Sequence, residues 1–114
     1  MTGSPVGLRS NLEALLASGQ DNALLRFTLG NECLKTDEGA TAAEHLERAV
    51  ELDPHYSAAW RQLGKARAAL RDNDGARAAW TEGVAAAERK GDLQAAREMG
   101  VFLRRLDKKT AGKT

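Results

Sequence analysis

The stretch LDPHYSAAWRQLG (residues 52–64) decides the fold class, because it predicts the end of one helix, a tight turn and the start of the next. Asp53 is a residue type that caps helix N-termini. Pro54 suits a first helical position, where the backbone amide has no partner. Trp60 and Gly64 then place a large ring and a gap along one side of the second helix. The stretch therefore predicts a helix–turn–helix unit.

The same pattern recurs when the sequence is shifted along itself so that Leu29-Gly30 falls on Leu63-Gly64. Four further positions recur at this spacing: Leu8, Leu12, Leu15 and Leu16; then Ala42, Leu46, Ala49 and Val50; then Ala76, Trp80, Gly83 and Val84. Towards the C-terminus Met99-Gly100 follows at a slightly longer spacing, as if the preceding loop held two extra residues. A fixed period of this length indicates a repeat architecture.

Apolar residues at helical spacing predict six helices. Four lie at about 6–18, 22–36, 40–52 and 54–71, the fifth runs from a turn with an N-cap at 72–74 to about 90, and the sixth lies at about 92–106. Gly19 is expected to stop the first helix, and Asp21 or Asn22 to cap the second. Thr41 and Glu44 have the spacing of a capping box for the third helix. Joints of a few residues make neighbouring helices antiparallel. Residues 107–114 have no apolar anchor and are expected to be a disordered tail.

Composition fits one all-α domain of 114 residues, with 42% hydrophobic, 29% charged and only 4% aromatic residues. Net charge is +1, divided unevenly: residues 1–88 carry 9 basic and 13 acidic groups, and residues 89–114 carry 8 basic and 3 acidic groups. A solvated basic helix end explains this better than a nucleic-acid site. The single cysteine allows no internal disulfide, and no signal-like or membrane-spanning apolar run occurs. A cytoplasmic location is therefore expected.

The repeat resembles the tetratricopeptide repeat, a helix–turn–helix unit of about 34 residues. The resemblance rests on the residues that build such a scaffold, here Leu29, Gly30, Ala42, Leu46, Ala49, Pro54, Trp60, Leu63, Gly64, Ala76, Trp80 and Gly83. Arg67 and Cys33 depart from it, since the family favours tyrosine at both positions.

The resemblance implies a small protein of bacterial type with two full repeats, folded as a right-handed α-solenoid of about six antiparallel helices. Residues 1–106 would form a single domain, with a first helix over 6–18, repeats over 23–56 and 57–90, and a capping helix over 92–106. Because an isolated repeat leaves its apolar face uncovered, the flanking helices are expected to close the two ends.

The resemblance also implies a concave groove that takes a peptide. The groove positions of the family fall on Leu24, Phe27, Asn31, Leu34, Lys35, Arg61, Lys65, Ala68, Arg97, Val101 and Arg104. Such a groove would be apolar at one end and cationic at the other, suited to a partner segment of acidic character. The alternative is a solvated basic surface with the apolar members in the core. The carboxylate clamp of some family members is incomplete, because Phe27 stands where that clamp needs lysine.

Catalytic and metal-binding chemistry find no support in the sequence. Cys33 is expected to be a small core residue rather than a nucleophile. His45 and His55 lie on different predicted helices without a third ligand at metal spacing. No phosphate-binding glycine loop and no catalytic grouping of side chains occurs. We therefore expect neither an enzyme nor a cofactor.

Three hypotheses of function remain. The first is an adaptor that binds a partner protein in its groove, as a monomer or weak homodimer. The second is a structural, self-associating module that pairs through an exposed end of the solenoid. The third, which the charge pattern favours least, is nucleic-acid contact through the basic C-terminal helix.

Overall fold

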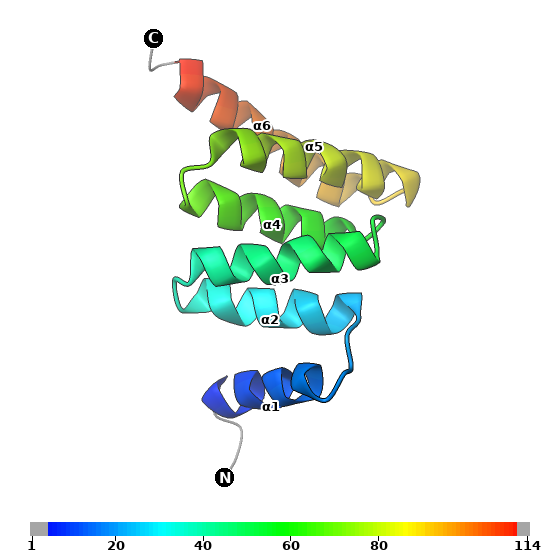
Figure 1. The fold of residues 1–114 in the computed structure, drawn as a ribbon. Coiled ribbons are helices and arrows are strands. Elements are labelled where there is room, and N and C mark those ends of the chain that lie inside the picture. Colours follow the sequence, from blue (N-terminus) through cyan, green and yellow to red (C-terminus); the bar gives the residue numbers. More distant parts are fainter. Residues whose placement is uncertain (1–4, 112–114) are drawn as a thin grey trace.

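The computed structural model describes residues 5–111, which form six helices stacked in chain order (Figure 1). The helices are α1 (Pro5–Ala17), α2 (Ala23–Lys35), α3 (Gly39–Leu52), α4 (Ser57–Ala69), α5 (Asn73–Arg89) and α6 (Leu93–Ala111). Each packs on the next, and α1 rests on α2 more lightly than the others rest on their neighbours. The predicted all-α solenoid is confirmed.

Side-chain caps begin three of these helices. The carboxylate or amide oxygens of Asn22, Asp72 and Asp92 accept hydrogen bonds from backbone amides three residues on, at 2.9, 2.9 and 3.1 Å. Gly19 and Gly91 follow the ends of α1 and α5 with φ of +99° and +75°, a conformation that glycine adopts without strain. The expected stop at Gly19 and the expected cap at Asn22 are confirmed.

The start of α4 differs from the prediction. The helix begins at Ser57 rather than at Pro54. The Asp53 carboxylate accepts a hydrogen bond from the backbone amide of His55 at 3.0 Å, so it closes the turn instead of capping the helix. The Pro54 carbonyl accepts a hydrogen bond from the Trp60 indole at 2.8 Å, which fixes this turn against the helix that follows it.

The start of α3 and the end of α6 also differ from the prediction. The Thr41–Glu44 capping box does not form; Glu38 is the N-cap and makes no side-chain cap, because its carboxylate binds Arg9 and Thr36. Helix α6 runs to Ala111, so residues 107–111 are helical rather than a disordered tail. The Asp107 carboxylate pairs with Arg77 of α5 and holds that extension. Residues 112–114 lie outside the described part of the chain.

The solenoid core consists of two clusters of small and aliphatic side chains. One joins α2 to α4 and reaches Ala79 of α5; the other joins α5 to α6 around Trp80 and Met99. Most of the predicted scaffold residues are buried, but Trp60 is half-buried and Pro54 is exposed.

Two glycines allow the paired helices to approach closely. A Cβ built on Gly30 would lie 2.5 Å from Leu46 Cγ, and one on Gly64 would lie 2.2 Å from the Trp80 Nε1 atom. Trp80 is 6% exposed and donates its indole hydrogen to the Arg61 carbonyl at 3.1 Å. The ring can therefore cover Gly64 only because that position has no side chain.

An ion pair attaches α1 to the start of α3. The Arg9 guanidinium donates hydrogen bonds to both carboxylate oxygens of Glu38, one of them at 3.1 Å, and to Glu13 at 3.2 Å. The hydrogen bonds from Arg9 and Thr36 lower the pKa of Glu38 from 4.5 to about 2. Because α1 is only lightly packed, this ion pair is a main link between α1 and the rest of the solenoid.

A matched pair of glycine substitutions tests the close approach. Gly64→Ala forces a methyl group against the Trp80 ring and should lower the free energy of unfolding by about 1–2 kcal/mol, despite the better helix propensity of alanine. At Gly100 the nearest atom to an added Cβ is Arg104 Nη1 at 3.6 Å. Gly100→Ala should therefore raise that free energy by about 0.5–1 kcal/mol. Urea unfolding measures both, and equal effects would contradict the assignment.

Removal of the Glu38 carboxylate tests the ion pair. Because the folded-state pKa is lowered, the stability that Glu38 contributes is present above pH 4.5 and lost as the pH falls through 2. Glu38→Gln should therefore be less stable than the wild type at pH 6, by a difference that shrinks towards zero near pH 2. Urea unfolding over this range measures the difference. Glu44→Gln, at an exposed carboxylate of α3, is the control, and a pH-independent difference for Glu38→Gln would contradict the interpretation.

Candidate binding surfaces

Helices α2, α4 and α6 lie in sequence along one face of the solenoid, and side chains link each to the next. The Gln62 amide of α4 donates to Asn31 of α2 at 2.9 Å. The Arg61 guanidinium donates to Glu98 of α6 at 2.9 Å. The Lys65 ammonium lies 5.5 Å from the centre of a ring in α6, that of Phe102. We call the surface of these three helices the inner face.

A hollow of about 500 Å³ opens on the inner face between α2 and α4. Its lining is polar at most positions and consists of Thr28, Asn31, Glu32, Leu34, Lys35, Gln62 and Lys65. We call it the α2–α4 hollow. It brings together four of the residues predicted for a peptide groove: Asn31, Leu34, Lys35 and Lys65.

The basic residues predicted for the groove differ in how freely they can bind a ligand. Arg61 is held in its ion pair with Glu98, and the Lys35 ammonium lies 2.8 Å from a Glu32 carboxylate oxygen. Lys65 is exposed and meets an aromatic ring rather than a carboxylate. In the predicted cationic groove, the charge of Arg61 is therefore largely neutralised by Glu98, whereas the charge of Lys65 remains available to a ligand.

The apolar groove residues divide between core and surface. The Phe27 ring packs on the Tyr56 ring with their centres 4.8 Å apart, and both Phe27 and Leu34 are half-buried against the core. Ala68 is half-buried against the α5–α6 cluster. Leu24 is 64% exposed and is the member of this set that most fully faces solvent.

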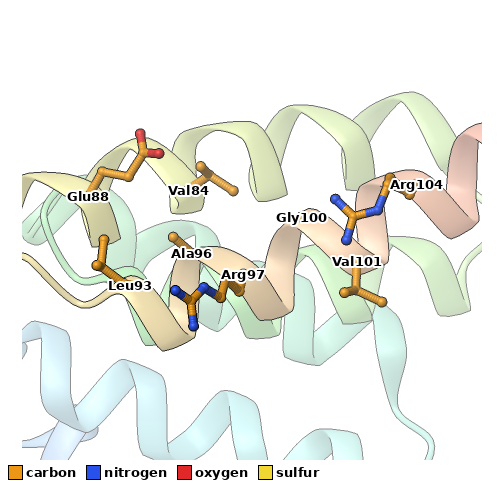
Figure 2. A pocket seen from close by; sticks show the side chains of 8 residues that line it. All are labelled: Val84, Glu88, Leu93, Ala96, Arg97, Gly100, Val101 and Arg104. Atoms are coloured by element: carbon orange, nitrogen blue, oxygen red, sulfur yellow. The ribbon is translucent and has the colours of Figure 1, made fainter.

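A second hollow, of about 510 Å³, lies at the end of the solenoid between α5 and α6. Figure 2 shows its lining: Val84 and Glu88 from α5, and Leu93, Ala96, Arg97, Gly100, Val101 and Arg104 from α6. We call it the end hollow. The predicted groove residues Arg97, Val101 and Arg104 therefore lie apart from the α2–α4 hollow. Val101 and Arg104 also line a further depression, of about 570 Å³, with Arg105, Asp107 and Lys108.

Several residues of the end hollow have no place in the groove prediction. Ala96 and Gly100 stand at scaffold positions when the longer spacing of the last helix is applied, and Val84 repeats Val50. In an interior repeat the next helix covers such positions. The signal that could have identified them is their repeat register, which places Gly100 on Gly64 and Val84 on Val50.

Cys33 and His45 line neither hollow. Cys33 is fully buried, and burial raises the pKa of its thiol, as expected of a core residue. Burial, and then the neighbouring Arg26 guanidinium, lower the pKa of His45. Within residues 5–111 no three His, Cys, Asp or Glu side chains are grouped so that they could hold a metal ion.

The stacked antiparallel helices and their repeated helix-to-helix contacts define a helical-repeat protein. No family model matches the chain. It is 58% identical over 97 residues to the TPR repeat-containing protein PA0015 of Pseudomonas aeruginosa, a match that covers 85% of this chain and 92% of that protein. The chain therefore belongs to the tetratricopeptide repeat family.

Solved structures agree with this assignment. The solution structure of protein BPP2914 from Bordetella parapertussis matches with a TM-score of 0.77 and 48% identity over 90% of each chain. The Sgt2 TPR domain from Aspergillus fumigatus matches with a TM-score of 0.71 and 25% identity, over 99% of this chain and 84% of that one. Domains of this family generally mediate protein–protein interactions. None of the helices in residues 5–111 is long and apolar enough to span a bilayer.

Proposed function

We propose that the chain is an adaptor that binds an extended, acidic segment of a partner protein along its inner face, centred on the α2–α4 hollow. The observation that carries the proposal is the position of Lys65. This exposed cation lines the hollow and also reaches towards α6, so it stands between two of the three helices that a bound segment would cross. An acidic side chain laid over the hollow can pair with Lys65.

The other residues of the hollow suit an extended backbone. The Gln62 amide already donates a hydrogen bond to Asn31, and the two side chains can offer further amide donors and acceptors to a peptide. Within the described residues, the buried atoms Gln62 Oε1 and Arg61 Nε have no hydrogen-bond partner. An unpartnered buried polar atom costs about 1–3 kcal/mol. Gln62 lines the α2–α4 hollow, so a ligand donor that reaches its Oε1 atom would remove that cost, which favours binding there.

Apolar contact would come from the α2 side of the hollow. Leu34 lines it, and the exposed Leu24 stands on the same helix. Phe27 packs on Tyr56 beneath this side of α2. It occupies the position at which a carboxylate clamp requires lysine. The expected ligand is therefore an internal acidic and apolar segment rather than a free C-terminal carboxylate. We also propose a cytoplasmic location, which the single, buried Cys33 supports.

A random peptide library tests this proposal. The full chain, immobilised, should enrich short phage-displayed peptides in which an Asp or Glu stands near an apolar residue. Reversal of two charges with Lys35→Glu and Lys65→Glu should weaken binding of a selected synthetic peptide at least about tenfold, which corresponds to ~1.4 kcal/mol. Fluorescence anisotropy measures the affinity, and circular dichroism checks that helicity is kept.

The control reverses two charges outside the hollow, with Lys90→Glu and Lys109→Glu, and should leave the affinity unchanged. Enrichment without an acidic preference, or equal losses in the two double variants, would contradict a site at the α2–α4 hollow.

A further inference from the structure

Three glycines occupy the same repeat position in α2, α4 and α6, and only two of them are covered. Leu46 of α3 lies over Gly30, and Trp80 of α5 lies over Gly64. Within the described part of the chain, the only atom within 4 Å of a Cβ built on Gly100 is Arg104 Nη1, which belongs to the same helix. Helix α6 thus has the surface of a first helix of a repeat, and the described chain holds no second helix to cover it.

Residues around Gly100 are also more exposed than the residues at the same repeat positions inside the stack. Val50 and Ser57 are 7% and 8% exposed inside the stack. Their counterparts at the end hollow are Val84, which is half-buried, and Leu93, which is 57% exposed. The end of the solenoid therefore keeps an apolar surface where a terminal helix is usually polar on its outer side.

Helix α1 lies at the other end of the molecule (Figure 1), and its sequence predicts a face that complements the end hollow. A shift by one repeat places Leu8, Leu12 and Leu15 on Ala42, Leu46 and Ala49, the face that a second helix turns towards its first helix. Leu12 corresponds to the residue that covers the glycine. Leu8 and Leu15 are 45% and 41% exposed, so no other helix of residues 5–111 covers this face.

We propose that α1 of a second copy of this chain docks in the end hollow, with its Leu12 over Gly100, so that α6 and the incoming α1 form a complete repeat between two molecules. The new contact continues the helix-to-helix interface that already runs through the stack. This proposal goes beyond binding at the α2–α4 hollow and does not rest on it.

Charge decides against the symmetrical arrangement of two end hollows. Pairing α6 with α6 would bring Arg97 and Arg104 of each copy against the same residues of the other, at a cost in repulsion. The apolar face of α1 offers Leu8, Leu12 and Leu15, which carry no charge. The contact is therefore head-to-tail, and because each copy keeps one free end, assembly continues into open chains as concentration rises.

Sedimentation velocity of the full chain, from micromolar to millimolar concentration, tests the proposal. The wild type should show a weight-average mass that rises with concentration. Gly100→Lys fills the end hollow, and Leu8→Glu with Leu15→Glu places charges on the docking face of α1; each variant should weaken assembly at least tenfold. Leu52→Glu, at a leucine that is 38% exposed and belongs to neither end, is the control and should assemble as the wild type does.

A mixture of the Gly100→Lys variant and the Leu8→Glu, Leu15→Glu variant gives the decisive test. The Gly100→Lys copy keeps its α1, and the Leu8→Glu, Leu15→Glu copy keeps its end hollow, so an equimolar mixture should form two-chain complexes that grow no further. A wild type that stays monomeric at millimolar concentration would overturn the proposal. So would assembly of Gly100→Lys alone, which would indicate α1 against α1, or a mixture that stays monomeric while both variants keep their helicity.

Discussion

The close approach of a helix backbone to a large side chain is the constraint on which the rest of the structure depends. Trp80 can lie on α4 because Gly64 leaves room for the ring, and Leu46 lies on α2 because Gly30 does the same. This contact sets the distance between the two helices of each repeat. Once that distance is fixed, small residues such as Ala42 and Ala76 complete the contact, and each pair offers a surface of similar shape to the next.

The sequence predicts this constraint well because it is local and repeated. A glycine and a large side chain recur once in every repeat, and the regularity of that spacing alone identifies which helix faces which. Helix ends are predicted less well, because a capping side chain can bind more than one group. Asp53 bonds to the turn instead of to α4, and Glu38 bonds to Arg9, which lies 29 residues away. Nothing in the sequence around Glu38 indicates a partner so far away.

The candidate site is predicted only in outline for the same reason. Repeat position places Asn31, Lys35 and Lys65 on the inner face, and the structure gathers them in one hollow. Repeat position does not predict that Arg61 binds Glu98, 37 residues further on, or that Phe27 packs on Tyr56. A sequence shows how many charges a surface carries. Which of them remain available depends on pairs formed between helices that are distant in the chain.

The two ends of the stack follow from the constraint that builds its interior. Within residues 5–111, α1 matches the second helix of a repeat and α6 matches the first helix, so these two outer helices carry the two halves of the interior contact. Gly100 stands at the repeat position of Gly64, but within residues 5–111 no side chain of another helix covers it as Trp80 covers Gly64. Leu12 stands at the repeat position of Leu46, but in the same part of the chain it has no counterpart of Gly30 to cover. Because the interior contact depends on shape more than on charge, the arginines that flank Gly100 do not prevent a helix from docking there through an uncharged face. The same arginines disfavour a second copy of α6, because like charges would meet. The charge around Gly100 therefore selects α1 over α6 as the helix that docks there.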